Sequence, residues 1–467
     1  MHFSVRHHLR GKTILLTGGT GFLGKVIVER LLFAAPEIAR IYLLIRETAA
    51  SAAARFDEEV LPAGIFAPLS VTHGSQWVRF VREKVVPIAG DVSQPKLGLG
   101  DDAFDAVTRE VDIVINSAAS VAFDAPLDDA LLHNTRSTQY VAEFARACRS
   151  ASLVHISTAY VAGRCAGRVM EGPLSDIAAE EIPAIDAIVQ DIASGMAPAA
   201  GAHAARERRE QLSAAGMTRA RSRGWHDTYT YTKALGEMLV AQHRGAVPTA
   251  IVRPTIIESS LRDPEPGWLE NLNVGDPLFV EYGRGRMHDF PLRLDTVFDI
   301  VPVDLVANAV VALLPHVAGM TNIGYFAIGS GGSNPLTGAR LYDISRDYFL
   351  QQPMLDRRGQ PIPPPAWTFP TPEQFRARLE NDARRSTAAK RLMYLADLYA
   401  GYTNADYVFD TSNTAALLGQ LNPDDRQTLD FDVRRIDWVQ YIQDVHIPGL
   451  RRHVLKEHAG SGVAARG

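Results

Sequence analysis

Thr13-Ile14-Leu15-Leu16-Thr17-Gly18-Gly19-Thr20-Gly21-Phe22-Leu23-Gly24 decides the fold of this 467-residue chain. The strand-forming run Thr13–Thr17 leads directly into glycines spaced as Gly18-x-x-Gly21-x-x-Gly24, and a helical stretch, Lys25–Phe33, follows at once. Glycines at this spacing let the backbone approach a pyrophosphate closely, and the helix N-terminus offers N–H donors and a partial positive charge. A turn without a ligand is the alternative, but the flanking strand and helix favour dinucleotide binding. We predict that the turn contacts the cofactor through Thr17, Gly18, Thr20, Gly21, Phe22, Leu23 and Gly24.

The alternation of strand and helix continues along the chain. Further helical stretches separate the β-rich runs, and the helix Thr228–Gln242 precedes the last of these runs. Such alternation predicts an α/β fold with a Rossmann-like, doubly wound parallel sheet and helices on both faces. The runs are Ile41–Ile45, Val85–Ala89, Ile113–Asn116, Leu153–Ser157 and Ala250–Val252.

Two segments interrupt this alternation. Ser175–Arg223 is rich in Ala, Arg and Glu and is predicted to be a helical insertion. Gln351–Pro372 contains Pro361-Ile362-Pro363-Pro364-Pro365, whose fixed φ angles favour an extended connector. We therefore expect a Rossmann-like domain over residues 1–334 and a smaller, mostly helical C-terminal domain over residues 335–467.

Composition excludes several classes of protein. A formal net charge of -5 gives no reason to expect a nucleic-acid partner, and the two cysteines form no disulfide framework or metal spacing. The N-terminus lacks the apolar core of a signal peptide, and no apolar run reaches transmembrane length. We expect a cytoplasmic protein and leave peripheral membrane contact open. Only seven of the 48 basic residues are lysines, a bias that indicates a bacterial, GC-rich genome.

The end of the second strand bears on which dinucleotide binds. An acidic residue there favours NAD, whereas a basic residue accommodates the 2′-phosphate of NADP. The strand ends Ile45-Arg46-Glu47, and the fork of the Arg46 guanidinium suits a phosphate, although a carboxylate at Glu47 would repel one. Adjacent strand residues face opposite ways, so only one of the two points at the ribose. We predict NADPH, with supporting cofactor contacts from the strand-end residues Asp91, Val92, Asn116, Ala118 and Ala119.

Tyr229 and Lys233 are spaced i, i+4 on a predicted helix and so share one face. Reduction of a carbonyl needs a hydride and a proton, and a lysine ammonium beside a phenol favours the phenolate and lowers the pKa of the phenol. A third group should stabilise the oxyanion that develops. The strand ending Ser157-Thr158 offers two hydroxyls for this purpose. His155, within that strand, is predicted to be a core histidine, and Tyr231 is predicted to point away from the site.

Taken together, these residues resemble those of the extended short-chain dehydrogenase/reductases, and more specifically those of the alcohol-forming fatty acyl-CoA reductases. The resemblance covers nearly the whole chain, and the stretches that carry it are spread along it. They are Thr17–Gly24, Tyr42–Arg46, His155–Val161, Asp227–Glu237, Val252–Ser260, Pro266–Trp268, Asp299–Asp304 and Ile436–Trp438 with Tyr441 and Pro448-Gly449.

The resemblance implies an NADPH-dependent reduction of long-chain fatty acyl thioesters to the primary alcohol in two hydride steps. It implies Tyr229 as proton donor, Lys233 as its electrostatic partner and Thr158, in preference to Ser157, as the hydrogen bonder of the oxyanion. It also adds Pro254, Thr255 and Ile256 to the cofactor contacts, beside Tyr229 and Lys233. Many members carry a second basic residue soon after the arginine that matches Arg46, where this chain has Glu47-Thr48.

Several alternatives remain open at the level of sequence. The same residues serve an enzyme that releases the aldehyde, and the acyl donor can be coenzyme A or an acyl-carrier protein. Two further hypotheses fit the sequence less well: a sugar-nucleotide epimerase or dehydratase, and a non-catalytic NADP-sensing protein. A monomer and a homodimer are both compatible with the sequence. The C-terminal domain and the insertion are the candidates for the apolar walls around the acyl chain.

Overall fold

A computed structural model describes residues 4–174, 177, 180–195, 202–383 and 386–457 of the chain. Parts of the predicted insertion, residues 175–176, 178–179 and 196–201, lie outside this description. The chain divides into two compact units. Unit 1 comprises Met1–Thr255, Ala307–Ile328 and Phe409–Phe431, and unit 2 comprises Ile256–Val306, Gly329–Val408 and Asp432–Gly467. Each unit is made of segments from both sides of residue 335. The two contiguous domains expected from the sequence, residues 1–334 and 335–467, remain a prediction.

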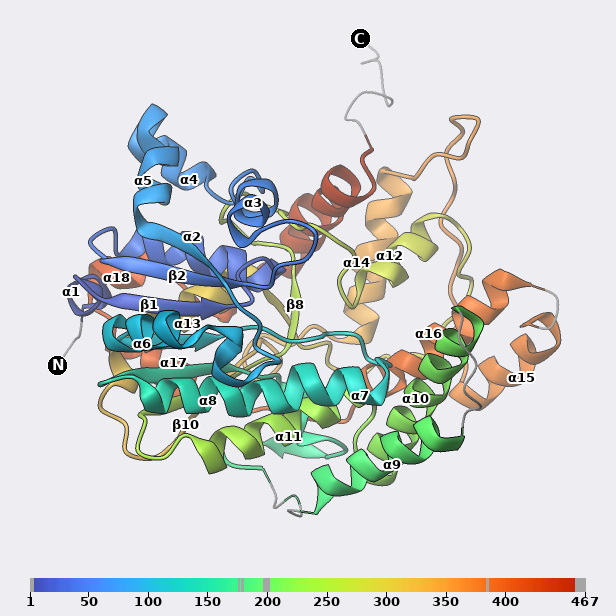
Figure 1. Cartoon of the computed structure of the whole chain (residues 1–467). Helices are drawn as coiled ribbons and strands as arrows, with labels where there is room; N and C mark the ends of the chain where they lie inside the picture. Colours follow the sequence, from blue (N-terminus) through green and yellow to red (C-terminus); the bar gives the residue numbers. More distant parts are fainter. Residues whose placement is uncertain (1–3, 175–176, 178–179, 196–201, 384–385, 458–467) are drawn as a thin grey trace, which may run out of the picture. The chain divides into compact units, whose positions relative to one another are not determined.

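Unit 1 is built on a seven-stranded sheet in the order β10-β7-β5-β4-β1-β2-β3, and every neighbouring pair is parallel. This confirms the predicted Rossmann-like α/β fold (Figure 1). The strands are β1 Thr13–Thr17, β2 Arg40–Ile45, β3 Val85–Ala89, β4 Ile113–Asn116, β5 Ser152–Ile156, β7 Thr249–Pro254 and β10 Gly324–Ile328.

Helices cover both faces of the sheet. The steps from β1 to β2 and from β4 to β5 run in opposite directions across it. Right-handed crossovers therefore place the connecting helices α2 and α8 on opposite faces. The helices of this unit are α1 Val5–Leu9, α2 Phe22–Ala34, α3 Ala52–Arg55, α4 Ala67–His73, α5 Trp77–Lys84, α6 Asp101–Glu110, α7 Leu127–Ala130, α8 Ser137–Ala147, α9 Glu181–Gly195, α10 Ala202–Ser222, α11 Thr228–His243, α17 Ser412–Gln420 and α18 Pro423–Thr428. The helix α13, Val303–Val317, spans the boundary between the two units.

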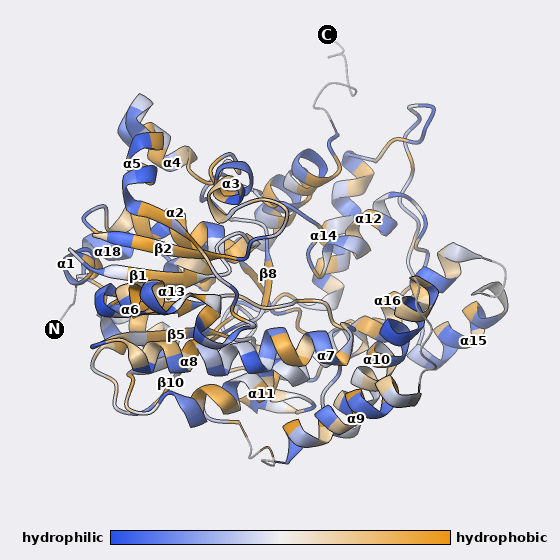
Figure 2. Ribbon diagram, in the orientation of Figure 1, coloured by the Kyte–Doolittle hydropathy of each residue, from blue (hydrophilic) through white to orange (hydrophobic). Residues whose placement is uncertain are grey.

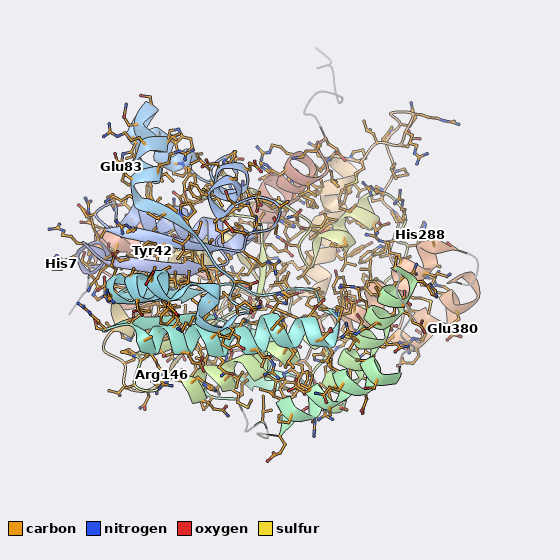
Figure 3. The ribbon with its side chains drawn as sticks, viewed as in Figure 1. His7, Tyr42, Glu83, Arg146, His288 and Glu380 are labelled. Atoms are coloured by element: carbon orange, nitrogen blue, oxygen red, sulfur yellow. The ribbon has the colours of Figure 1, made fainter. Side chains whose placement is uncertain are left out.

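β1 and β2 are coloured largely as hydrophobic in Figure 2, and successive residues of both strands are buried. In one layer of the core, Leu15, Val114 and Leu153 lie next to one another on the neighbouring strands β1, β4 and β5. They belong to one cluster with Phe144 of α8 and Val240 of α11. Strands that are buried on both faces have nearly continuous apolar sequences, and such runs predicted the strands of this sheet. At the rim, the Tyr42 hydroxyl donates to a Glu110 carboxylate oxygen at 2.8 Å and so joins β2 to α6 (Tyr42 is labelled in Figure 3).

Unit 2 is mainly helical around a short parallel pair of strands, β8 Ile256–Glu258 and β9 Ile300–Pro302. The prolines at 361–365 lie between helices and adopt no helix themselves, as predicted. Within the described ranges, every helix is too short or too polar to cross a lipid bilayer. The helices of this unit are α12 Asp276–Gly283, α14 Gly338–Gln351, α15 Pro372–Ala383, α16 Thr387–Thr403, α19 Trp438–Gln440 and α20 Ile447–Gly449. Of the remaining short strands, β6 Gly167–Val169 belongs to unit 1, and β11 Tyr407–Phe409 includes residues of both units.

Candidate active site

The glycine turn between β1 and α2 has a geometry that larger residues would disrupt. Gly18 has φ +72°, and a Cβ there would lie 2.6 Å from the backbone nitrogen of Ala118. A Cβ on Gly24 would lie 2.1 Å from the Gly18 carbonyl oxygen. Gly21 is the N-cap of α2 and has more open space around it. The turn is thus packed against the end of β4 and exposes the N-terminus of α2, the arrangement that binds a pyrophosphate.

A buried hydrogen-bond chain fixes the ends of three neighbouring strands. The Thr17 hydroxyl donates to Asn116 Oδ1 at 2.7 Å and accepts from the Ala118 N–H at 3.2 Å. The Asn116 amide nitrogen lies 3.1 Å from Nδ1 of His155. His155 is fully buried, as predicted, and burial holds its pKa well below the usual value. The polar groups of Thr17 and Asn116 therefore serve to position the backbone that lines the site.

A cleft of about 1260 Å³ opens at the carboxyl ends of β1, β2, β3 and β4. The N-terminal part of α10, including Arg206 and Arg209, forms one wall, so the predicted insertion reaches this cleft. The predicted cofactor residues that line it are Gly18, Thr20, Gly21, Arg46, Asp91, Val92, Ala118 and Ala119. Those outside its lining are Thr17, Phe22, Leu23, Gly24, Asn116, Tyr229, Lys233, Pro254, Thr255 and Ile256.

The residues after β2 give the cleft a basic corner. Arg46 lines the cleft, whereas the carboxylate of Glu47 accepts from the backbone N–H of Ala52 at 3.1 Å. Arg55 of α3 also lines the cleft and donates to the Arg46 carbonyl at 2.6 Å. Glu59 holds the Arg55 guanidinium through both of its oxygens. The chain thus supplies a second arginine here, nine residues after Arg46.

Tyr229 and Lys233 lie on α11, which begins where the Asp227 carboxylate accepts from the Thr230 N–H at 2.7 Å. The Lys233 ammonium donates to the carbonyl of Ile156, the last residue of β5, at 2.7 Å. This contact brings α11 to the strand end that carries Thr158. The Tyr229 ring packs edge-on against Phe123, with centroids 6.0 Å apart.

Burial controls the protonation of both groups. It raises the pKa of Tyr229, and the Asp227 carboxylate raises it further. Burial lowers the pKa of Lys233 to about 8. The spacing predicts that the ammonium lowers the pKa of the phenol, whereas in the structure burial and the Asp227 carboxylate raise it. Tyr229 is therefore a neutral phenol at physiological pH, which can donate a proton.

The two hydroxyls after β5 have different surroundings. Among the described residues, the Thr158 hydroxyl makes two long contacts of 3.4 Å: it donates to the Pro254 carbonyl and accepts from the Tyr160 N–H. The Ser157 hydroxyl is buried without a hydrogen-bond partner among the described residues. Thr158 precedes the helical turn Ala159–Ala162. Because its hydroxyl makes only long contacts there, it can rotate toward another acceptor.

Asn134 is a positioning residue that sequence reasoning missed. Its side chain accepts from the Ser120 N–H at 2.8 Å and donates to the Ser120 carbonyl at 2.9 Å. It also donates to the Thr232 hydroxyl on α11 at 3.2 Å. Asn134 therefore ties the loop that lines the cleft to the helix of Tyr229 and Lys233, and no local pattern in the sequence marks it.

Tyr231 points away from these residues, as predicted. Its hydroxyl donates to the Glu181 carboxylate, which also forms ion pairs with Arg219 and Arg223. The Tyr231 ring packs against Trp225. This face of α11 holds the helices α9 and α10 in place.

Unit 2 contains a narrow apolar cavity of about 70 Å³. Aromatic side chains dominate its walls, and Glu258 contributes an ionisable group. The aromatic residues are Phe279 and Tyr282 of α12, Phe290, Phe298, Tyr342 of α14, Trp367, and Tyr399 and Tyr402 of α16. Several of them come from beyond residue 335, the region predicted to form an apolar wall around the acyl chain.

Comparisons with known proteins find relatives along nearly the whole chain. Two family models described as "Male sterility protein" match, one of NAD-binding type over residues 16–310 and the other over residues 377–457. "Fatty acyl-CoA reductase 2, chloroplastic" of Arabidopsis thaliana is 36% identical over 97% of this chain and 79% of its own length. "Alcohol-forming fatty acyl-CoA reductase" of Simmondsia chinensis is 32% identical over 97% of this chain and 99% of its own length. The chain thus carries a domain that binds a nicotinamide dinucleotide.

Among solved structures, the terminal R domain from the myxalamid PKS-NRPS biosynthetic pathway is similar to this chain, with a TM-score of 0.63. The alignment covers 95% of this chain and 91% of that one at 20% identity. At this identity the likeness establishes a shared fold and nothing more.

Proposed function

Because the chain belongs to the fatty acyl-CoA reductase family, we propose that it reduces a long-chain fatty acyl-CoA to the primary alcohol with NADPH, in two hydride transfers through a bound aldehyde. One observation carries the proposal. The dinucleotide turn, the Thr158 hydroxyl and the helix of Tyr229 and Lys233 all meet the carboxyl edge of one sheet, where parallel α/β folds bind their ligands.

We assign the catalytic roles as follows. NADPH bound along the glycine turn would supply the first hydride, and a second NADPH would supply the hydride for reduction of the aldehyde. The hydroxyls of Thr158 and Tyr229 donate to the substrate oxygen as charge develops on it in the thioester step. Collapse of that adduct expels the coenzyme A thiolate and leaves the aldehyde, and Tyr229 protonates the alkoxide formed by the second reduction. The Lys233 ammonium, fixed by the Ile156 carbonyl, supplies positive charge on the same side of α11.

Arg46 and Arg55 support the choice of NADPH over NADH. Both line the cleft at the end of β2, where the 2′-phosphate of NADP is bound in this fold. Glu47 would repel a phosphate, but its carboxylate is engaged by the Ala52 N–H.

We expect Arg46→Ala and Arg55→Ala each to weaken NADPH binding by about 10- to 100-fold, the value of one charge-assisted hydrogen bond. NADH binding should change little, because NADH lacks the 2′-phosphate. Kd values for both cofactors, from fluorescence titration, check this. Arg79→Ala, which removes an exposed ion pair with Glu83, is the matched control and should leave both values unchanged. Equal losses for the two cofactors would remove the phosphate role.

The apolar cavity of unit 2 supports an acyl chain as substrate. Each buried methylene contributes about 0.8 kcal/mol, so its aromatic walls would favour a long chain over a short one. At about 70 Å³ the cavity is narrow, so the walls would have to part to admit a complete long chain.

Leu278→Trp, which fills the cavity, should lower kcat/KM for a C16 acyl-CoA by about 10-fold relative to a C8 acyl-CoA, the equivalent of excluding two methylenes. Competition assays with mixed acyl-CoAs measure the ratio directly. Leu350→Trp is the control, since Leu350 is an exposed leucine of α14 in the same unit. An unchanged ratio in Leu278→Trp would place the acyl chain elsewhere.

Release of the aldehyde is the second candidate outcome, because the same side chains serve one reduction or two. Counting NADPH oxidised per coenzyme A released decides between them. A ratio of two, with alcohol in the product, supports the proposal, and a ratio of one with free aldehyde contradicts it. The same assay with acyl-carrier-protein thioesters identifies the donor.

A further inference from the structure

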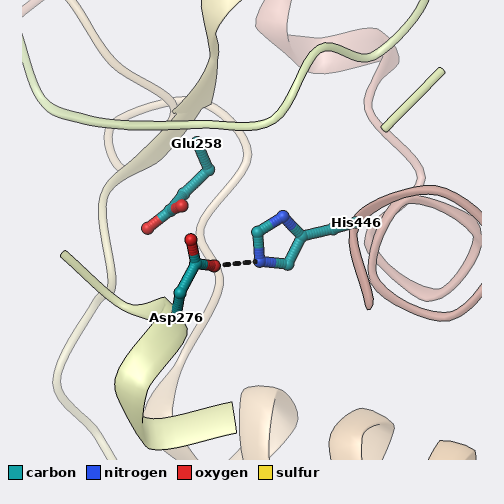
Figure 4. A group of neighbouring side chains, drawn as sticks. All are labelled: Glu258, Asp276 and His446. Carbon is teal, nitrogen blue, oxygen red and sulfur yellow. Dashed lines mark ion pairs between the residues drawn. The ribbon is translucent and has the colours of Figure 1, made fainter. Parts of the chain in front are cut away.

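Three ionisable side chains meet in the interior of unit 2 (Figure 4). Glu258 is the last residue of β8, Asp276 is the first residue of α12, and His446 ends the helical turns Tyr441–His446. Their exposed fractions are 1%, 0% and 2%. The reduction proposed above uses none of them.

Each of these side chains is held by a contact that leaves one atom free. Glu258 Oε1 accepts from the Gly275 N–H at 3.0 Å, and Asp276 Oδ2 accepts from the Asn273 N–H at 2.6 Å. His446 Nδ1 lies 3.0 Å from the Ser259 hydroxyl. The remaining atoms, Glu258 Oε2, Asp276 Oδ1 and His446 Nε2, have no hydrogen-bond partner among the described residues.

The three free atoms face one another. One ligand atom from each residue lies within 4.8 Å of the other two, and Asp276 Oδ1 is 3.1 Å from His446 Nε2. No Lys or Arg of the described residues forms an ion pair with either carboxylate. Figure 4 marks the ion pair between Asp276 and His446, but one imidazole can offset at most one of the two carboxylates. The other carboxylate is costly to bury, since a buried charge requires a partner or a metal ion.

We propose that Glu258, Asp276 and His446 bind one divalent transition-metal ion, with Zn²⁺ as the best match. Two carboxylate oxygens and an imidazole nitrogen are ligands that Zn²⁺ accepts at about 2.0–2.2 Å, and three atoms this close together can share one centre after small rotations. Mg²⁺ and Ca²⁺ suit the site less well, because they prefer oxygen ligands throughout.

The surroundings of His446 fit this assignment. A histidine that binds a metal usually anchors its other ring nitrogen on a hydrogen-bonding group. Here that group is the Ser259 hydroxyl, and the Tyr441 hydroxyl in turn donates to the Ser259 carbonyl at 2.7 Å. Glu258 and Gly275 also line the apolar cavity, so the ion would hold one wall of that cavity by joining β8, α12 and the 441–446 segment. The role is structural.

Metal content and metal-dependent stability test the proposal. The full-length chain, purified without a polyhistidine tag, is stripped with a chelator and titrated with Zn²⁺, Mn²⁺, Mg²⁺ and Ca²⁺. We expect about one equivalent of Zn²⁺ by mass spectrometry after removal of excess metal. We also expect a rise in Tm of about 5 °C with Zn²⁺ and a much smaller one with Mg²⁺ or Ca²⁺. Co²⁺ in place of Zn²⁺ should give a visible absorption band.

Variants separate this site from adventitious binding. His446→Gln and Asp276→Asn should lose the bound equivalent and the Zn²⁺-dependent rise in Tm. Asp304→Asn is the matched control, because Asp304 is a buried carboxylate of the same unit that caps the backbone N–H groups of Leu261 to Asp263. It should lower the Tm yet retain the metal.

Two results would overturn the proposal, and the first needs only the wild-type protein. One is wild-type protein that retains less than about 0.1 equivalent of every ion tested and shows no change in Tm. The other is undiminished Zn²⁺ binding in His446→Gln. A proton shared between the carboxylates would then explain the cluster, since burial and the Asp276 charge raise the pKa of Glu258.

Discussion

Replacing Tyr229 by phenylalanine is expected to lower kcat for long-chain acyl-CoA reduction by about 10²- to 10⁴-fold, the usual contribution of a positioned general acid. The substitution removes only the hydroxyl, since the ring packs edge-on against Phe123 and phenylalanine keeps that contact. Burial raises the pKa of Tyr229, so the phenol that is lost is protonated and able to donate. NADPH binding should change little. Steady-state turnover with a C16 acyl-CoA and a separate NADPH titration check both parts.

Tyr231→Phe is the matched control for this experiment. It lies on the same helix, but its hydroxyl donates to Glu181 on the far side of α11. We expect its turnover to stay within a few-fold of wild type, with some loss of thermal stability because a buried hydrogen bond is removed. Wild-type turnover in Tyr229→Phe would show that another group supplies the proton. Equal losses in the two variants would indicate damage to α11 rather than loss of an acid.

The residues near the glycine turn could be predicted because local rules govern them. Gly18 needs a positive φ and Gly24 needs close backbone approach, and both demands leave glycine as the only fitting residue type. The parallel sheet followed from apolar runs that alternate with helices. The i, i+4 spacing of Tyr229 and Lys233 likewise translates directly into a shared helix face.

Residues that act across long sequence distances could not be predicted in this way. Asn134 reaches Thr232 on α11, 98 residues along the chain, and stands in no recognisable pattern. Arg55 is only nine residues from Arg46, but its place in the cleft depends on how α3 folds back against the end of β2. For the same reason, the sequence did not predict that each unit is built from three separate segments of the chain. Glu258 and His446 lie side by side in unit 2 although most of the C-terminal half separates them in the chain. Spacing rules describe neighbours within one element and carry no information about such pairings.

The pKa shifts of Tyr229 and Lys233 could not be predicted from the sequence either. Proximity of an ammonium to a phenol is readable from spacing, whereas the loss of water around both groups depends on the complete fold. Desolvation disfavours each charged form, so it raises the pKa of Tyr229 and lowers that of Lys233. The two shifts leave a neutral acid beside a lysine that titrates near physiological pH.

Activity is accordingly expected to fall as pH rises above about 8, the pKa to which burial lowers Lys233. Below this value the side chain is an ammonium that supplies positive charge beside the Ile156 carbonyl, and above it the charge is lost. Unfolding does not explain such a fall. The folded lysine releases its proton near pH 8 and the unfolded one near 10.5, so between these values the unfolded state binds more protons. Stability contributed by this group therefore increases with pH across that window.

The variants Lys233→Met and Lys233→Arg distinguish the effect of the Lys233 charge on activity from the effect of the shape of its side chain. Methionine keeps the aliphatic stem without the charge, and we expect it to lower kcat/KM by about 10²-fold at pH 7, roughly 2.7 kcal/mol of transition-state stabilisation. Arginine stays charged throughout the range, so its activity, although reduced by a different fit, should not fall between pH 8 and 10. Profiles of kcat/KM against pH for the three proteins, with Tm measured at each pH, provide the test. A wild-type profile that is flat from pH 7 to 10, or an arginine variant that falls in parallel with wild type, would show that the titrating group is not Lys233.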